Sequence, residues 1–134
     1  MKIMKSSRIV LGAILLMLLL LAVWLIISFI FNDGTDNIGD GYTYYPEQQF
    51  ITGKHEIPPR VLEYKYNDEV IVVKQRPLEH QDIMYKDYNY FMGRDTLYYW
   101  IIEKKAPRII GPLDYENFIN RVSEYNDKRL VLEE

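Results

Sequence analysis

The pattern of apolar and polar positions divides the chain into two unequal parts. Residues 9–31 form an unbroken run without a charged side chain, and Ser28 is the only polar residue in it. As a helix with a rise of about 1.5 Å per residue, the run reaches roughly 34 Å, and a hydrocarbon core is about 30 Å thick. Residues 9–31 are therefore predicted to be a transmembrane helix in direct contact with the lipid bilayer.

Charges beside this run predict its orientation. Lys2, Lys5 and Arg8 precede it, and no lysine or arginine follows until Lys54. Loops rich in lysine and arginine stay on the cytoplasmic side of a membrane helix. We therefore expect a single-pass protein of the cell membrane, with residues 1–8 in the cytoplasm and residues 32–134 on the extracytoplasmic side.

A cleaved signal peptide is the alternative interpretation. Secretory apolar regions have about 7–15 residues and end at small side chains, whereas this run is longer and ends in Phe29, Ile30 and Phe31. These features favour an uncleaved signal anchor, and cleavage stays open as the second interpretation. Processing as a lipoprotein would require a cysteine, and the chain has none.

Beyond the apolar run, the pattern changes to that of strands. Residues 32–41 are predicted to be a flexible spacer, because glycine, asparagine and aspartate dominate there. Leu62, Tyr64 and Tyr66 then alternate with charged residues, which is typical of a half-buried strand. The predicted strands are residues 42–45, 49–52, 61–66, 69–76, 97–103 and 108–110, with Asn67-Asp68 as a hairpin turn.

A helical pattern follows in the C-terminal part. Asp114 is a helix-capping residue type, and the apolar stripe after it consists of Tyr115, Phe118, Ile119 and Val122. We predict a break at Gly111-Pro112, a helix from residue 115 to about 125, and a short strand at residues 130–132. Residues 42–134 are thus expected to form an α+β domain, a small, mainly antiparallel β-sheet with one C-terminal helix packed on it.

Aromatic residues leave two interpretations open. All 12 tyrosines lie after residue 41, and they either fill the core of a small sheet domain or form a binding face. Residues 77–95 form a long irregular segment that carries several of them. The candidate partner-binding residues are Tyr85, Tyr88, Tyr90, Tyr99 and Trp100.

Composition narrows the range of functions. All 19 acidic residues and all but three of the 16 basic residues follow the apolar run, so residues 32–134 carry a net charge of −6, which disfavours nucleic acid as a partner. The absence of cysteine excludes disulfides and thiolate metal sites. His55 and His80 stand outside any H-E-x-x-H pattern, and Ser123 lies outside a G-x-S-x-G motif. We therefore predict no enzymatic activity, no metal site and no cofactor.

One series of short motifs carries a family resemblance. Between residues 40 and 118 the chain contains, in order, Asp40-Gly41-Tyr42, Ile57-Pro58-Pro59, Val61–Tyr66, Tyr99-Trp100-Ile101-Ile102 and Gly111-Pro112-Leu113 with Phe118. The series resembles an uncharacterised family of small bacterial envelope proteins, whose members are lipoproteins or single-pass proteins without an assigned activity. The resemblance implies an envelope protein and supplies no catalytic residue. Because this chain lacks cysteine, residues 9–31 would be its tether.

A second resemblance is shorter. Residues 99–102, a turn, residues 110–113 and the following helix resemble the core of GYF-type domains, which bind proline-rich peptides on aromatic residues. Leu113 stands where that pattern has an aromatic residue, and a plain hairpin leading into a capped helix accounts for the same residues. We therefore expect a non-enzymatic interaction or structural protein whose exported domain contacts another envelope protein or the cell wall. The alternative is a module that binds proline-rich or extended peptides on an aromatic face.

Overall fold

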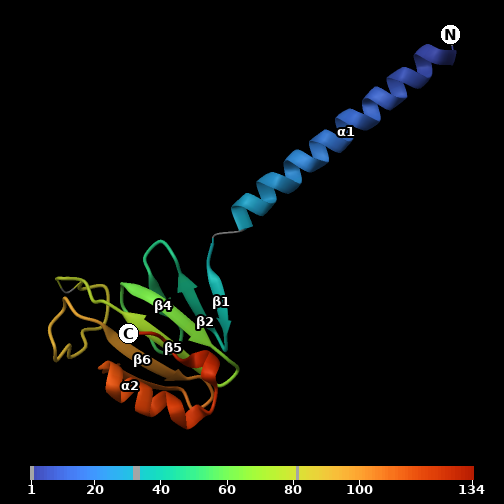
Figure 1. Cartoon of the computed structure of the whole chain (residues 1–134). Helices are drawn as coiled ribbons and strands as arrows, with labels where there is room; N and C mark the ends of the chain where they lie inside the picture. The colour runs from blue at the N-terminus through green and yellow to red at the C-terminus, as the bar shows by residue number, and fades with distance from the viewer. Residues whose placement is uncertain (1, 32–33, 81) are drawn as a thin grey trace. The chain divides into compact units, whose positions relative to one another are not determined.

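The N-terminal part of the chain is one long helix. The computed structural model describes residues 2–31, 34–80 and 82–134, which divide into two compact units on either side of Gly34-Thr35. The first unit contains α1 (Lys2–Phe31; Figure 1). Its segment Lys5–Ile30 is long and apolar enough to cross a membrane, and none of that segment is buried within the protein.

The second unit contains two antiparallel sheets and a C-terminal helix (Figure 1), which confirms the predicted α+β class. The smaller sheet has the order β1-β2-β3 and consists of β1 (Asp36–Gly39), β2 (Tyr42–Tyr45) and β3 (Phe50–Thr52). The larger sheet has the order β4-β5-β6-β7 and consists of β4 (Val61–Tyr66), β5 (Val70–Gln75), β6 (Tyr98–Glu103) and β7 (Arg108–Leu113). Helix α2 (Tyr115–Val122) and two 3₁₀ turns, Ser123–Tyr125 and Lys128–Leu130, complete the unit.

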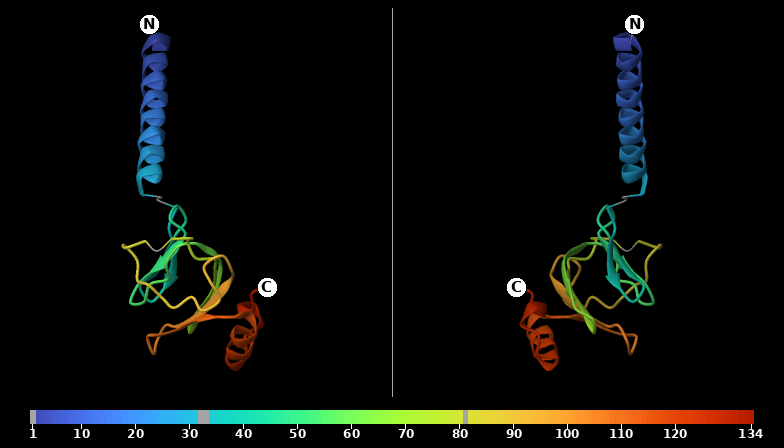
Figure 2. Two further views of the ribbon diagram at one scale, coloured as in Figure 1. Left: turned by 90° about the vertical axis from the view of Figure 1, so that its left-hand side faces the viewer. Right: turned by 90° about the vertical axis from the view of Figure 1, so that its right-hand side faces the viewer.

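The larger sheet is covered on both faces. One face packs against the smaller sheet through a buried cluster that includes Ile38, Ile71 and Trp100. The other face packs against α2 and the C-terminal segment through a cluster that includes Tyr99 and Phe118. Figure 2 shows the β1–β2 hairpin (cyan to green) and α2 (red) on opposite sides of the larger sheet. The domain therefore has three layers, with the larger sheet in the middle.

Local side-chain hydrogen bonds explain a turn and a helix start that were predicted. The Oδ1 of Asn67 accepts hydrogen bonds from the backbone N–H groups of Glu69 and Val70, both at 2.8 Å, and so closes the β4–β5 turn. The Oδ1 of Asp114 accepts a hydrogen bond from the N–H of Asn117 at 2.8 Å, which caps α2.

The predicted spacer is wrong over part of its length. Residues 32 and 33 lie outside the described residues, but Asp36–Gly39 forms β1 and pairs with β2. Asp40 and Gly41 have φ angles of 52° and 82° and make the turn between these strands, a geometry that Asp-Gly readily adopts in hairpins. Ile38 is fully buried. The compact unit therefore begins at Thr35, before the expected boundary at residue 42.

Other predicted details also differ from the structure. Leu62 is 49 % exposed, because a bulge between Val61 and Glu63 reverses the alternation of side chains in β4. Gly111-Pro112 does not end a strand, since β7 continues to Leu113. Residues 130–132 form no strand; Leu130 and Leu132 are instead buried beside α2.

Candidate functional site

The long connection between β5 and β6 packs against the core through two of its tyrosines. The ring of Tyr88 meets Trp100 edge-on with centroids 4.7 Å apart, and its hydroxyl donates a hydrogen bond to the carbonyl of Glu56 at 3.1 Å. The ring of Tyr90 lies 5.1 Å from that of Tyr98. Burial raises the pKa of both Tyr88 and Tyr90, so their phenols stay neutral. These two side chains cover the core.

A buried amide joins this loop to the larger sheet. The indole N–H of Trp100 donates to the Oε1 of Gln75 at 2.7 Å. The Nε2 of Gln75 donates to the carbonyl of Pro58 at 2.9 Å, and it lies 3.2 Å from both the carbonyl of Pro59 and the hydroxyl of Tyr90. Gln75 is fully buried. Its amide therefore satisfies polar groups from β6, from the Pro58-Pro59 segment and from the loop at once.

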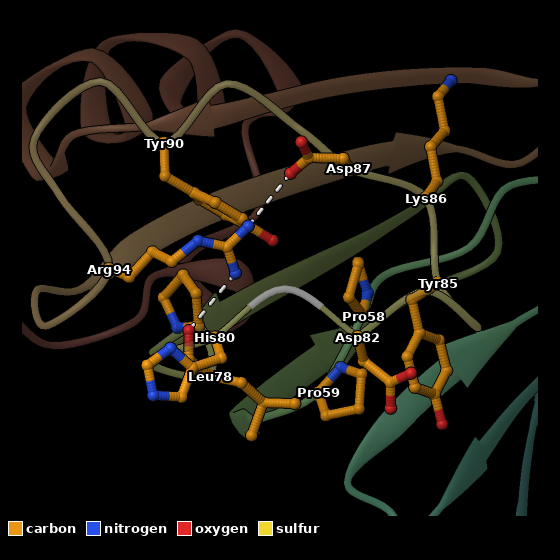
Figure 3. Close-up of a pocket in the computed structure, with 11 residues that line it drawn as sticks. Pro58, Pro59, Leu78, His80, Asp82, Tyr85, Lys86, Asp87, Tyr90 and Arg94 are labelled. Carbon is orange, nitrogen blue, oxygen red and sulfur yellow. Dashed lines mark hydrogen bonds and ion pairs between the residues drawn. The ribbon is translucent and has the colours of Figure 1, made fainter.

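Arg94 joins distant parts of this loop to one another (Figure 3). Its guanidinium lies 5.1 Å from the ring centre of Tyr90 and donates hydrogen bonds to the carbonyl of Leu78 at 3.2 Å and to Asp87 at 3.0 Å. The hollow around these groups, which Pro58 also lines, encloses about 20 Å³. A cavity needs about 10–15 Å³ of such space to hold one water, so this hollow has no room for an organic substrate.

Apolar side chains do gather at one place on the surface. Tyr45 and Phe50 stack with centroids 5.0 Å apart, and Tyr85 meets Phe50 at 5.4 Å. Ile83 and Met84, next to Tyr85 in the chain, are 96 % and 80 % exposed. We call these five residues the Tyr85 patch. Of the predicted partner-binding residues, Tyr85 is the one that lies in it.

The other predicted residues lie elsewhere. Tyr99 and Trp100 are 1 % and 0 % exposed and belong to the clusters on opposite faces of the larger sheet, so in this structure they do not line a groove that a partner could enter. Tyr45 and Phe50 were missed by sequence analysis. They are register partners across the β2–β3 turn, and the sequence analysis predicted both strands but not their pairing.

Charged side chains near the smaller sheet have structural partners. The Nζ of Lys104 donates to the carbonyl of Ile38 at 2.5 Å and lies 5.0 Å from the ring centre of Tyr66. Burial lowers the pKa of Lys104. The hydroxyl of Tyr64 donates to Asp36. These contacts tie β1 to the larger sheet. Within residues 2–31, 34–80 and 82–134, no three His, Cys, Asp or Glu residues are grouped as a metal would require.

Comparison with known proteins identifies the domain at the family level. The family described as Protein of unknown function (DUF3997) matches residues 40–134. The chain belongs to the DUF3997 family. Membership confirms the expectation of an uncharacterised family, and the DUF3997 match extends beyond Phe118 to Glu134. No curated protein and no solved structure gives a significant match. An envelope location of the DUF3997 domain stays a prediction.

Proposed function

We propose that this DUF3997 protein is a single-pass membrane protein whose exported domain acts by contact with another component of the cell envelope, not by catalysis. The observation that carries this proposal is α1. Its apolar side chains from Ile9 to Ile30 are exposed, and residues 32–35 join the helix to the first strand of a compact domain. An apolar surface of this length is stable in lipid and costly in water.

The domain supports a role in contact through the way its polar side chains are used. Gln75 and Arg94 hold the loop, and Lys104 holds β1. Glu103 is bonded to Arg108 at 2.8 Å and accepts from Tyr125 at 2.6 Å. Side chains that satisfy one another in this way stabilise the fold, and they leave the Tyr85 patch as the candidate contact surface.

Extraction of the full-length protein from cells tests the anchor. We expect the protein to stay in the membrane fraction after alkaline carbonate treatment, since α1 is held by its apolar surface. Mass spectrometry should recover peptides that contain Lys5 and Arg8. A mature N-terminus near residue 32, or release into the soluble fraction, would contradict the proposed anchor.

Photo-crosslinking in cells tests the role in contact. A photoreactive phenylalanine analogue replaces Tyr85 in one variant and the exposed Glu116 of α2 in a matched control. We expect discrete adducts, with protein or with lipid, from position 85 and few from position 116. Equal or absent adducts at both positions would mean that the patch is not a contact surface.

A further inference from the structure

The Tyr85 patch consists of apolar and aromatic side chains, as do surfaces that become buried on binding. Ile83 and Met84 are largely exposed and directly precede Tyr85 in the chain. The ring of Tyr85 meets Phe50 edge-on, and Phe50 stacks on Tyr45. Ile83 also borders an open hollow with Arg60 and Leu78. Contiguous exposed apolar side chains usually mark contact with a protein, a ligand or a membrane. Their position in the fold decides which.

Strand register places the patch at the end of the smaller sheet where the chain arrives from α1. Asp36, the first residue of β1, is the register partner of Tyr44. Tyr45 follows Tyr44 and is in turn the partner of Phe50. Figures 1 and 2 agree that the turn between β2 and β3 lies at the same end of this sheet as the start of β1. The patch is therefore next to the point of attachment.

The connecting chain is short. Only residues 32–35 separate the end of α1 from β1, and an extended chain covers at most about 3.6 Å per residue. The covalent path from Phe31 to Asp36 is thus no longer than roughly 18 Å. A membrane-spanning α1 would keep the beginning of β1 this close to lipid at all times, whereas no such tether holds a protein partner near the patch.

We propose that the Tyr85 patch rests on the surface of the lipid bilayer that α1 crosses. This inference rests on the proposed single-pass anchor and names the component that the patch contacts. Tyrosine side chains suit this position, because an aromatic body enters the boundary of the acyl chains while the hydroxyl stays at the headgroups. Ile83 and Met84 are the side chains of the patch that enter the bilayer furthest.

The charges around the patch predict how the contact depends on lipid. Asp82 and Lys86 flank residues 83–85 with opposite signs, and residues 32–134 are acidic as a whole. Attraction to anionic headgroups is therefore not the driving force. Docking through the patch is expected on zwitterionic bilayers and is expected to change little with salt concentration.

Fluorescence quenching by labelled lipid tests the inference on the full-length chain. Because the chain has no cysteine, single substitutions Ile83→Cys and Met84→Cys place an environment-sensitive dye at the patch, and Asn120→Cys places it on an exposed position of α2. Each labelled protein is reconstituted into phosphatidylcholine bilayers that contain a nitroxide at the headgroup. We expect a blue-shifted and strongly quenched signal at positions 83 and 84, and a water-like, weakly quenched signal at position 120.

A second set of variants separates the patch from the tether alone. The dye is placed at the exposed Gln48 of the β2–β3 turn, and Met84→Asp is added to disrupt the patch. Val131→Asp is the matched control, because Val131 is 39 % exposed and lies outside the patch. Quenching at position 48 is expected to fall with Met84→Asp and to persist with Val131→Asp. If positions 83 and 84 are quenched no more than position 120, the patch does not rest on lipid. Carbonate extraction reports on the anchor separately, so that result would leave the anchor intact and point to a protein partner.

Discussion

At the scale of single residues, a few buried polar groups hold segments that are distant in the chain. Such a group brings together the short sequence motifs on which the family resemblance rests. The carbonyls of Pro58 and Pro59 and the indole of Trp100 all bond to Gln75. Gly111, at φ 143°, lies where a Cβ atom would be 2.7 Å from the Trp100 ring. The Pro58-Pro59 segment, β6 with Trp100 and β7 with Gly111 are thus parts of one packing arrangement.

Replacement of Gln75 tests this arrangement. Gln75→Ala is expected to lower the free energy of unfolding by about 3 kcal/mol, because it leaves the Trp100 indole and a proline carbonyl buried without partners. Gln48→Ala, at an exposed position, is the matched control and should stay within about 0.5 kcal/mol. Urea unfolding of the full-length chain in detergent, followed by near-UV circular dichroism, measures both. Equal effects of the two substitutions would show that the network contributes nothing.

The phenol groups of Tyr99 and Tyr125 are expected to make folding stability depend on pH in the alkaline range. Burial raises the pKa of Tyr99 and of Tyr125 to about 12, from an ordinary value of 10.0. As pH rises above 10, the unfolded chain therefore loses these protons before the folded one does, and folding stability falls between about pH 10 and 12. The contribution is complete below pH 10. Urea midpoints measured across this range should decline.

The variant Tyr125→Phe tests whether these phenols cause the decline in stability above pH 10. It removes one of the two phenols, and with it the hydrogen bond to Glu103. The decline in the urea midpoint above pH 10 should become shallower in this variant. An identical decline in wild type and Tyr125→Phe would assign the effect to other groups.

At the scale of residues, the sequence left two roles open for the aromatic side chains and assigned one residue of β4 to the wrong face. The tyrosines suit either a core or a binding face, and both faces of the larger sheet are covered, so Tyr99 and Trp100 are core residues. Leu62 was assigned to the wrong side because one bulge shifts the alternation. The bulge has no local sequence signal, and the strands predicted at residues 42–45 and 49–52 carry no signal that they form a second sheet over the larger one.

At the scale of elements, α2 is the part that sequence predicted best. Its cap and its apolar stripe are local features, and the structure confirms both: Phe118 and Val122 are buried, and the Phe118 ring stacks on Tyr99 at 4.9 Å. The strand β1 is the opposite case. Ile38 is its only apolar residue, and Lys104, far along the chain, bonds its carbonyl. Asp40-Gly41 was the available signal of a hairpin turn.

Truncation of Phe118 tests the docking of α2. Phe118→Ala should cost about 3–5 kcal/mol, because the cavity lies between α2 and the larger sheet. His80→Ala, at an exposed position, should stay within about 0.5 kcal/mol. His55→Ala should cost about 1 kcal/mol, since His55 Nε2 lies 2.8 Å from the carbonyl of Pro107. Thermal melts of the full-length chain decide between these values, and a silent Phe118→Ala would mean that α2 does not contribute to stability.

At the scale of the whole molecule, the basic N-terminal flank predicts the topology. A periplasmic-type reporter enzyme, joined after Glu134 through a flexible linker, should be active outside the cytoplasm. Changing Lys2, Lys5 and Arg8 together to glutamate removes the charge bias and should reduce that activity. A reporter that is active only in the cytoplasm would reverse the orientation and remove the basis for an exported domain.

The three-layer arrangement has a consequence for how the protein is made. Ile38 covers one face of the larger sheet and Leu132 lies against the other, so segments synthesised early and late are both needed to close the domain. While the ribosome is still adding the last residues, α1 has already left it, but the sheet face that receives Phe118 and Leu132 is bare. In the proposed topology, the domain would therefore cross the membrane as an open chain and complete its folding on the far side, with α1 holding its N-terminal end in the bilayer.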